Sequence, residues 1–359
     1  MFILEQVQTP LTSDAFNLGP VALRSGQEEA GGSTEPASGR VVALPSLRIM
    51  IDTTAEAGIG RSTRAVVVGA GSIGARHRRV LADLGLRVRV VSRRSGFGDH
   101  GAVGEAVTSF DPGYVVIATE TENHARALAD LAASGFTGRV LVEKPILPEP
   151  GPVPVDGFEW IGIGYNLRFH PGVAALRSAI GMDRVLSAHA RVGQYLPEWR
   201  PERDYRDTVT AGPAGGVLLE LSHELDLLNW LVGPTDVLFG AAVHTGTLEI
   251  ERDDLAVGVF CLPGGGLASF ELNCIDRTPH RSLTMTTTKR TVGLDLLTGQ
   301  LQVDGEVVYE CSVARDESFA AMHRAALKGG QDVCSVAEAM TIVSQVQELR
   351  SGHVRVDAQ

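Results

Sequence analysis

The chain has 359 residues, of which 44% are hydrophobic and 21% charged, the composition of a globular protein long enough for two domains. Its formal net charge of −11 lacks the excess positive charge that draws proteins to nucleic-acid phosphates, so we expect no nucleic-acid partner. No apolar run reaches the roughly 18 residues that span a bilayer, and the segment MFILEQVQTP lacks the pattern of a secretory leader, which predicts a cytoplasmic protein without a membrane partner.

Residues 1–62 differ in composition from the rest of the chain. The stretch 25–39 is rich in glycine, serine, glutamate and proline, which is typical of a segment that cannot bury enough apolar surface to fold. We expect an N-terminal extension that is partly disordered, and we assign it no function.

Residues 63–165 show short valine-rich and isoleucine-rich runs that alternate with helical patterns. The helical stretches 75–85 and 122–135 repeat apolar residues every three or four positions. This alternation predicts a Rossmann domain, in which helices cover both faces of a doubly wound parallel sheet. The expected strands are 65–70, 86–92, 114–119, 139–145 and 158–166.

A glycine-rich turn follows the first of these strands. Gly69, Gly71 and Gly74, with Ser72 and Ile73 between the last two, form a G-x-G-x-x-G motif that opens a helix. The first glycine permits a tight turn, the second lets a pyrophosphate approach the backbone, and the third lets helix and strand pack closely. The motif predicts a dinucleotide site at the helix N-terminus.

The second strand ends in Ser92, Arg93 and Arg94, where an NAD-specific site carries an acidic residue that binds the ribose. Two guanidinium groups can instead pair with a 2′-phosphate, which favours NADP(H) over NAD(H). The alternative is that both arginines are solvated and that either cofactor binds.

Glu143, Lys144 and Pro145 end the fourth strand, at the sheet edge where such folds bind ligands. Only three of the 32 basic residues are lysines, namely Lys144, Lys289 and Lys328. A lysine at this edge therefore suggests a group that exchanges or shares a proton, which arginine cannot do.

Residues 166–359 predict a second domain for substrate binding and oligomerisation, of α+β type with a large open, mostly antiparallel sheet. Helices are expected at 171–181, 215–233 and 335–352, the last with a capping box formed by Ser335 and Glu338. Because burying an exposed apolar sheet face is favourable, we expect a homodimer or homotetramer through this sheet. The expected strands are 185–195, 236–250, 255–263, 266–274, 281–289, 290–297 and 306–313.

The helix expected at 215–233 carries a cluster of titratable residues. A neutral His223 could take a proton from a substrate hydroxyl, supported by an acid such as Glu220 on the same helix face or Asp226. A solvated helix face is the alternative interpretation. The cysteines Cys261, Cys274, Cys311 and Cys334 have neither C-x-x-C spacing nor neighbouring histidines, so we expect free thiols and no metal.

Five segments resemble one family in their order and spacing: AVVVGAGSIGARH, ATETENHARALADLAASG, VLVEKPI, GYNLRFHP and GGVLLELSHELDLLNWLVG. They are similar to the glucose-fructose oxidoreductase, inositol dehydrogenase and rhizopine-catabolism (Gfo/Idh/MocA) family over roughly residues 63–355. The resemblance implies a nicotinamide cofactor and hydride transfer at a sugar or polyol carbon.

By position, the resemblance implies that Lys144 faces cofactor and substrate and that His223 is the general acid/base. Many members carry an aspartate four residues before this histidine, where this chain has Leu219. The remaining implied residues are Thr119, Asn123, His124 and Glu143 near the cofactor, and Tyr165 and Arg168 near the substrate.

The segment between 193 and 212 is polar and aromatic. Its Trp199, Arg200 and Tyr205 could stack on a sugar and bind an anionic group, or the segment could be structural. We expect an NAD(P)-dependent oxidoreductase that interconverts a secondary alcohol and a ketone on a sugar, polyol or nucleotide-linked sugar. The alternatives are a non-catalytic NADP(H)-binding regulatory or scaffold protein, and a reductase of a non-sugar C=C or C=N bond.

Overall fold

A computed structural model describes residues 63–199, 201–312, 314 and 316–352 of the chain. The expected N-terminal extension, residues 1–62, lies outside the described residues, as does Arg200. Two sheets organise the described part, one of five strands and one of eight. None of the helices in these described ranges is long and apolar enough to cross a membrane.

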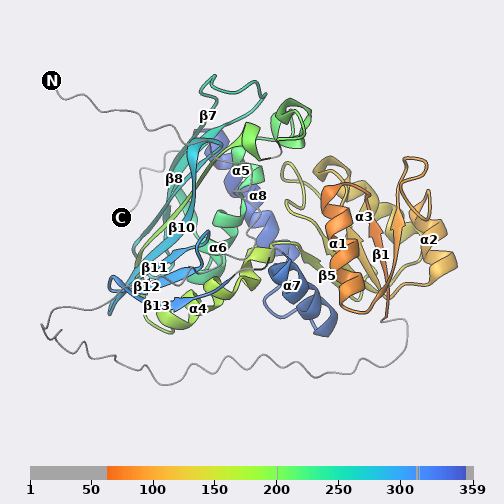
Figure 1. Ribbon diagram of the computed structural model, residues 1–359, viewed down its shortest axis with the longest axis horizontal. Coiled ribbons are helices and arrows are strands. Elements are labelled where there is room, and N and C mark those ends of the chain that lie inside the picture. The colour runs from red at the N-terminus through yellow and green to blue at the C-terminus, as the bar shows by residue number, and fades with distance from the viewer. Residues whose placement is uncertain (1–62, 200, 313, 315, 353–359) are drawn as a thin grey trace, which may run out of the picture. The chain divides into compact units, whose positions relative to one another are not determined.

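The five-stranded sheet is entirely parallel and has the strand order β2-β1-β3-β4-β5 (Figure 1). The runs AVVV and YVVI are buried along their whole length, because helices cover both faces of such a sheet. The order reverses between β1 and β3, and sheets of this kind usually bind ligands at the carboxyl ends of the strands at such a point. The strands are β1 (Arg64–Val68), β2 (Arg87–Val91), β3 (Tyr114–Ile117), β4 (Arg139–Val142) and β5 (Trp160–Ile163).

Three helices connect these strands: α1 (Ser72–Asp83), α2 (Val103–Phe110) and α3 (His124–Ala133). Helix α2 was not predicted from the sequence. It ends at Asp111, whose φ of 48° is the left-handed conformation that closes many helices. The doubly wound parallel sheet predicted for this region is confirmed.

Helix α7 (Glu317–Lys328) is distant in sequence from the parallel sheet but packs on it. Its Phe319, Met322 and Ala326 share a core cluster with Val67 and Val116. Neither α7 nor strand β12 was predicted. The stretch 166–359, expected as a separate domain, thus contributes a helix to the core of the parallel sheet.

The eight-stranded sheet has the order β13-β12-β11-β10-β6-β9-β8-β7, and β6 with β9 is its one parallel pair among these strands. The predicted large, mostly antiparallel sheet is therefore confirmed. The strands are β6 (Val185–Tyr195), β7 (Asp236–Val243), β8 (Leu255–Cys261), β9 (Leu267–Asn273), β10 (Ile275–Thr287), β11 (Thr291–Asp295), β12 (Gln300–Val303) and β13 (Glu306–Glu310).

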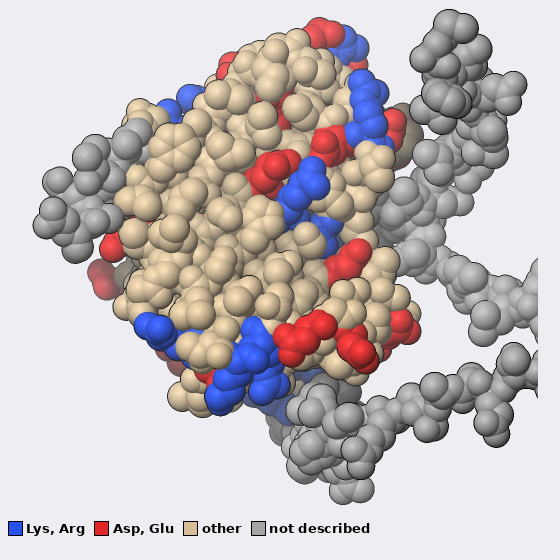
Figure 2. Space-filling model, turned by 90° about the vertical axis from the view of Figure 1, so that its left-hand side faces the viewer, with Lys and Arg blue, Asp and Glu red and all other residues tan. Residues whose placement is uncertain are grey.

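Helices α4 (Pro171–Ile180), α6 (His223–Val232) and α8 (Val336–Arg350) pack on one face of this sheet. Along β6 the side chains alternate, with Ala188 and Ala190 buried beneath these helices and Ser187 and His189 exposed. Figure 2 shows the other face, where charged side chains gather mainly toward the margins. Helix α8 begins with the capping box predicted at Ser335 and Glu338.

The helix expected over 215–233 is broken in two, which corrects the prediction. Helix α5 (Val217–Glu220) ends at Glu220, and α6 begins at His223. The Ser222 hydroxyl donates to the Leu219 carbonyl at 3.0 Å, the local side-chain bond by which serine competes with helical hydrogen bonding. The break turns His223 into the first residue of a helix.

Short 3-10 helices complete the described chain. They are η2 (Thr121–Asn123), η3 (Asn166–Phe169), η4 (Leu196–Glu198), η5 (Tyr205–Asp207) and η6 (Val209–Ala211).

Candidate active site

The turn between β1 and α1 has the geometry that each of its glycines predicts. Gly69 adopts a φ of 120°, and a Cβ atom there would lie 2.3 Å from the Ala118 carbonyl oxygen. A Cβ on Gly74 would lie 2.0 Å from the Gly69 oxygen, whereas a Cβ on Gly71 would meet no atom within 4 Å. Gly71 is thus open to a ligand, and no side chain caps the free N–H groups of α1.

The end of β2 lies beside this turn, because Val68 and Val91 are paired in the sheet. Arg93 and Arg94 are both exposed there, and the Arg94 guanidinium lies 4.7 Å from the centre of the Phe97 ring. Ser92 accepts a hydrogen bond from the Arg94 backbone N–H at 3.2 Å. Two positively charged groups therefore stand at the edge where a dinucleotide ribose would be recognised.

The loop after β3 carries the next predicted cofactor residues. The Thr119 hydroxyl is buried and has no hydrogen-bond partner among the described residues, which leaves it for a ligand. Asn123 is half-buried and donates to Glu120 at 3.3 Å. His124 is buried. One of its ring nitrogens lies 3.1 Å from the backbone oxygen of Thr119, and the other lies 3.0 Å from the backbone oxygen of Pro145. His124 therefore joins two loops of the site.

Lys144 follows β4 at the same sheet edge, joined to Pro145 by a cis peptide bond. Its ammonium group donates to the backbone oxygen of Glu220 at 2.7 Å. Since Glu220 ends α5, this bond brings Lys144 to the break that precedes His223. The structure thus brings together the two residues predicted to carry the chemistry.

His223 is half-buried, and its Nδ1 atom is enclosed without a hydrogen-bond partner among the described residues. Its ring contacts the ring of Tyr165 edge-on, with 5.5 Å between the centres. Burial, together with the nearby charges of Lys144 and Arg281, holds the pKa of His223 well below its ordinary value. The positive end of α6 acts in the same direction. The imidazole is therefore neutral near pH 7 and can accept a proton.

Neither acid expected to support His223 is bonded to it, which corrects that prediction. The Glu220 carboxylate accepts from the Thr210 hydroxyl at 3.2 Å. Asp226 forms an ion pair with Arg168 at 2.6 Å, in which both side chains are almost fully buried. Burial raises the pKa of Asp226 to about 6, although the Arg168 guanidinium opposes that shift.

Tyr165 and Arg168, expected near the substrate, are both buried, with 1% and 4% of their surfaces exposed. Besides Asp226, Arg168 pairs with Glu338 at 3.0 Å, so its donors are already occupied by protein groups. The Tyr165 hydroxyl donates to Ser222 at 3.3 Å. Both residues contact side chains at or after the break between α5 and α6, and neither exposes a surface to a ligand.

The segment after β6 keeps part of its predicted aromatic surface. Trp199 is half-buried, with an indole N–H that has no partner among the described residues. Tyr205 is half-buried, and its hydroxyl accepts from the Glu249 backbone N–H at 3.1 Å. Arg200 cannot be placed, since it lies outside the described residues.

One residue near His223 was missed by the sequence analysis. Arg281 extends from β10 and pairs with the buried Glu224 at 2.6 Å, close enough to His223 to lower its pKa. It lies 57 positions from its partner, and no local motif marks it. Only the pairing of β10 with β6, against which α6 packs, brings it to the site.

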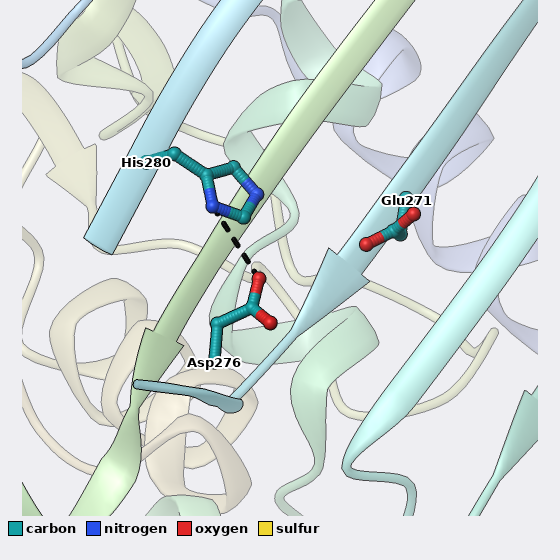
Figure 3. Close-up of side chains that lie close together, drawn as sticks. All are labelled: Glu271, Asp276 and His280. Carbon is teal, nitrogen blue, oxygen red and sulfur yellow. Dashed lines mark ion pairs between the residues drawn. The ribbon is translucent and has the colours of Figure 1, made fainter. Parts of the chain in front are cut away.

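Glu271, Asp276 and His280 form a separate cluster on β9 and β10, with ligand atoms within 4.8 Å of one another (Figure 3). Arg191 already pairs with Glu271 at 3.2 Å and with Asp276 at 3.6 Å. A protein cation therefore balances both carboxylates, and we assign no metal to this cluster.

Comparison with known proteins agrees with this arrangement. Residues 178–292 match the model of the GFO/IDH/MocA C-terminal domain. No curated protein matches the chain by sequence.

Several solved structures share the fold. UDP-N-acetylglucosamine 3-dehydrogenase GnnA from Acidithiobacillus ferrooxidans is 18% identical with a TM-score of 0.64, over 81% of this chain and 97% of that chain. GenD2 from gentamicin A biosynthesis, in complex with NAD, is 18% identical with a TM-score of 0.67, over 83% and 95%.

The WlbA dehydrogenase from Bordetella pertussis, in complex with NADH and UDP-GlcNAcA, is 18% identical with a TM-score of 0.65, over 80% and 95% of the two chains. At this identity the likeness to solved structures concerns the fold, while the domain match rests on the sequence itself. Residues 178–292 thus match the GFO/IDH/MocA C-terminal domain in sequence, and the fold of the described chain is similar to that of these dehydrogenases.

Proposed function

We propose that the protein is a nicotinamide-dependent oxidoreductase that interconverts a secondary alcohol and a ketone on a sugar, polyol or nucleotide-linked sugar. The observation that carries the proposal is the approach of Lys144 to the helix break before His223, whose Nδ1 atom is enclosed and unbonded within the described ranges. A buried polar atom without a partner favours a ligand group that completes it. The nucleotide-sugar dehydrogenases among the similar structures support the same substrate class.

The two residues have complementary roles. In oxidation, neutral His223 accepts the proton of the substrate hydroxyl, while the ammonium group of Lys144 stabilises the negative charge that develops on that oxygen. In reduction, His223 returns the proton to the same oxygen. The hydride would be accepted or supplied by a nicotinamide when one is bound.

The residues of the glycine turn fit such a cofactor. Open space at Gly71, the free N–H groups of α1 and the unpaired Thr119 hydroxyl support binding there. For the ribose we propose that Arg93 and Arg94 favour NADP(H), because both are exposed and no carboxylate ends β2. The similar structures solved with NAD or NADH support the nicotinamide group itself.

The cofactor preference is tested by fluorescence titration with NADPH and NADH. The unchanged protein should bind NADPH more tightly, and the Arg93→Ala, Arg94→Ala double variant should lose roughly tenfold or more of NADPH affinity while keeping NADH affinity, because only NADPH carries the 2′-phosphate. Arg324→Ala, an exposed arginine on α7, is the matched control. Equal binding of the two cofactors by the unchanged protein would refute the preference.

The reaction is tested with a panel of nucleotide-linked sugars, free sugars and polyols, followed by absorbance of the reduced cofactor. Lys144→Ala and His223→Gln should each lower kcat by roughly 10²- to 10⁴-fold, the usual contribution of a general acid/base. Lys328→Ala is the control for the loss of a lysine.

Cofactor binding without turnover of any substrate would instead favour a non-catalytic binding protein. That alternative has one observation in its support, since Asp226 and Glu220 are bonded elsewhere and leave His223 without an acidic partner in the described structure. Product analysis would distinguish reduction of a C=C or C=N bond.

We further propose that copies of the chain associate through the eight-stranded sheet. The face opposite the helices exposes Phe239 and Val243 on β7, Val257 on β8 and Leu267 on β9. Apolar groups grouped on one face favour a protein partner.

A further inference from the structure

Four buried side chains form a hydrogen-bonded row, which we call the buried relay: Tyr114, His323, His77 and Glu143. The Tyr114 hydroxyl lies 2.9 Å from His323 Nδ1, His323 Nε2 lies 2.8 Å from His77 Nδ1, and His77 Nε2 lies 2.8 Å from Glu143 Oε1. The first three residues are 0% exposed and Glu143 is 7% exposed. They come from β3, α7, α1 and the end of β4.

The chemistry of the four groups gives the relay one direction. Glu143, when ionised, can only accept, so His77 must donate from Nε2 and accept at Nδ1 if it is neutral. His323 then donates from Nε2 and accepts at Nδ1 from the Tyr114 hydroxyl. Every donor and acceptor along the relay is satisfied in this single arrangement.

Protonation of His323 is opposed by its surroundings. Burial, followed by the nearby His77, holds the pKa of His323 well below its ordinary value. Burial also raises the pKa of Tyr114 well above its ordinary value, although the positive charge of Arg139 opposes that shift. Both shifts favour the neutral forms of His323 and Tyr114, as the direction of the relay requires.

The relay ends directly beside the proposed site. The second oxygen of Glu143, Oε2, accepts the backbone N–H of Lys144 at 3.2 Å. The side chain of Lys144 continues to the Glu220 oxygen at 2.7 Å. A Cβ atom on Gly164 would lie 3.0 Å from Glu143 Oε1, so a side chain at position 164 would crowd the carboxylate.

The imidazole of His77 also lies against a neighbouring aromatic ring. The ring of Phe319 packs edge-on against His77 with 5.4 Å between the centres, and the Arg76 guanidinium lies 5.1 Å from the centre of the Phe319 ring. His77 and His323 are 246 positions apart, so the bond between them fastens α7 to α1. The orientation of Glu143 thus depends on a helix that follows the eight-stranded sheet in the chain.

We propose that the buried relay holds the Glu143 carboxylate in one orientation and, through Glu143, fixes the position of Lys144, so that His77 and His323 are positioning residues. The effect on turnover rests on the proposed function, whereas the effect on Lys144 itself does not. The relay moves no proton to solvent, because it ends at the fully buried Tyr114.

The first experiment measures how fast an amine-specific reagent labels each lysine, read by mass spectrometry of the full chain after digestion. The chain has three lysines, so Lys289 and Lys328 serve as internal controls for Lys144. His323→Leu removes the relay bond and should raise the labelling rate of Lys144 at least threefold, with the two other rates unchanged.

His323→Gln is the matched variant that restores the relay. The glutamine amide can accept from Tyr114 through its oxygen and donate to His77 through its nitrogen, so Lys144 should again be labelled at the original rate. Phe319→Leu alters packing beside His77 without removing a relay bond and should leave the Lys144 rate unchanged. Equal Lys144 rates in the unchanged protein and His323→Leu, or in the leucine and glutamine variants, would overturn the proposal.

The second experiment connects the relay to turnover. With an active substrate, His323→Leu should lower kcat about tenfold while KM and cofactor affinity change less than about twofold, and His323→Gln should recover kcat. A change confined to KM, or no recovery by glutamine, would contradict a positioning role in the reaction. If the unchanged protein turns over no substrate, the proposed function fails, and the lysine labelling still decides whether the relay positions Lys144.

Discussion

Buried polar residues in this protein are fixed by partners that lie far away in sequence. Arg168 pairs with Asp226 across 58 positions, and His77 meets His323 across 246. Sequence motifs identified the glycine turn and Lys144, because in those cases the signal and the function lie in the same few residues. Sequence motifs could not predict that Arg168 forms an ion pair with Asp226, since the burial of Arg168 depends on tertiary pairing.

His170 shows how such a residue sets a pH dependence. Its Nδ1 atom accepts the Gly172 backbone N–H at 3.0 Å and so caps the start of α4. Burial, together with the charge of Arg281, lowers the pKa of His170 from 6.5 to about 4. A neutral ring is therefore part of the folded state.

We expect the free energy of unfolding to decrease as the pH falls from about 6.5 to 4. Over that range His170 takes up a proton in the unfolded chain but not in the folded one, which costs about 3 kcal/mol of stability. His170→Asn keeps a capping side chain without a titrating group, so its unfolding free energy should vary less with pH. Urea unfolding at several pH values measures the difference. An equal slope for the two proteins would show that His170 does not contribute.

The elements of this fold were predicted where a single local pattern determines them. The strand at 185–195 coincides with β6, because its alternating side chains face helices on one side only. Helix α7 was missed, since it buries Ser318 and His323 along with Phe319 and Met322, and polar residues obscure an apolar stripe. The expected helix over 215–233 failed because Ser222 interrupts an otherwise helical pattern with a bond to Leu219.

The capping box of helix α8 allows the contribution of an N-cap to stability to be tested. Ser335 accepts the Glu338 backbone N–H at 3.2 Å, and Glu338 accepts the Ser335 backbone N–H at 2.7 Å. We expect Ser335→Ala to lower the free energy of unfolding by about 1 kcal/mol, the usual effect of losing an N-cap. Urea unfolding measures this, with Ser351→Ala at the other end of the helix as the control. If Ser335→Ala lowers the free energy of unfolding no more than the control does, the cap contributes little to the stability of the protein.

The whole molecule presents two differently covered sheets. Helices enclose the parallel sheet, and its Val66, Val67, Val115 and Val116 are fully buried. The described helices that pack on the eight-stranded sheet lie on one face of it, and its other face carries the cluster shown in Figure 3 beside exposed apolar side chains. The alternating pattern of the sequence predicted a half-covered sheet, but a single chain does not specify how many copies would cover it.

Association through this face is the prediction for the whole molecule. Val257 lies on a strand between β7 and β9, opposite Ala241 and Glu271 in the neighbouring strands, so it stands within the face and not at its edge. Light scattering at micromolar concentration should give a particle of two or four times 38.1 kDa, and Val257→Glu should shift it to the mass of one chain, because association would bury an unpaired charge. Met182→Glu changes a fully exposed apolar residue outside the sheet and should leave the mass unchanged. A single-chain mass for the unchanged protein would rule out association, whereas an oligomer that tolerates Val257→Glu would place the interface on another surface.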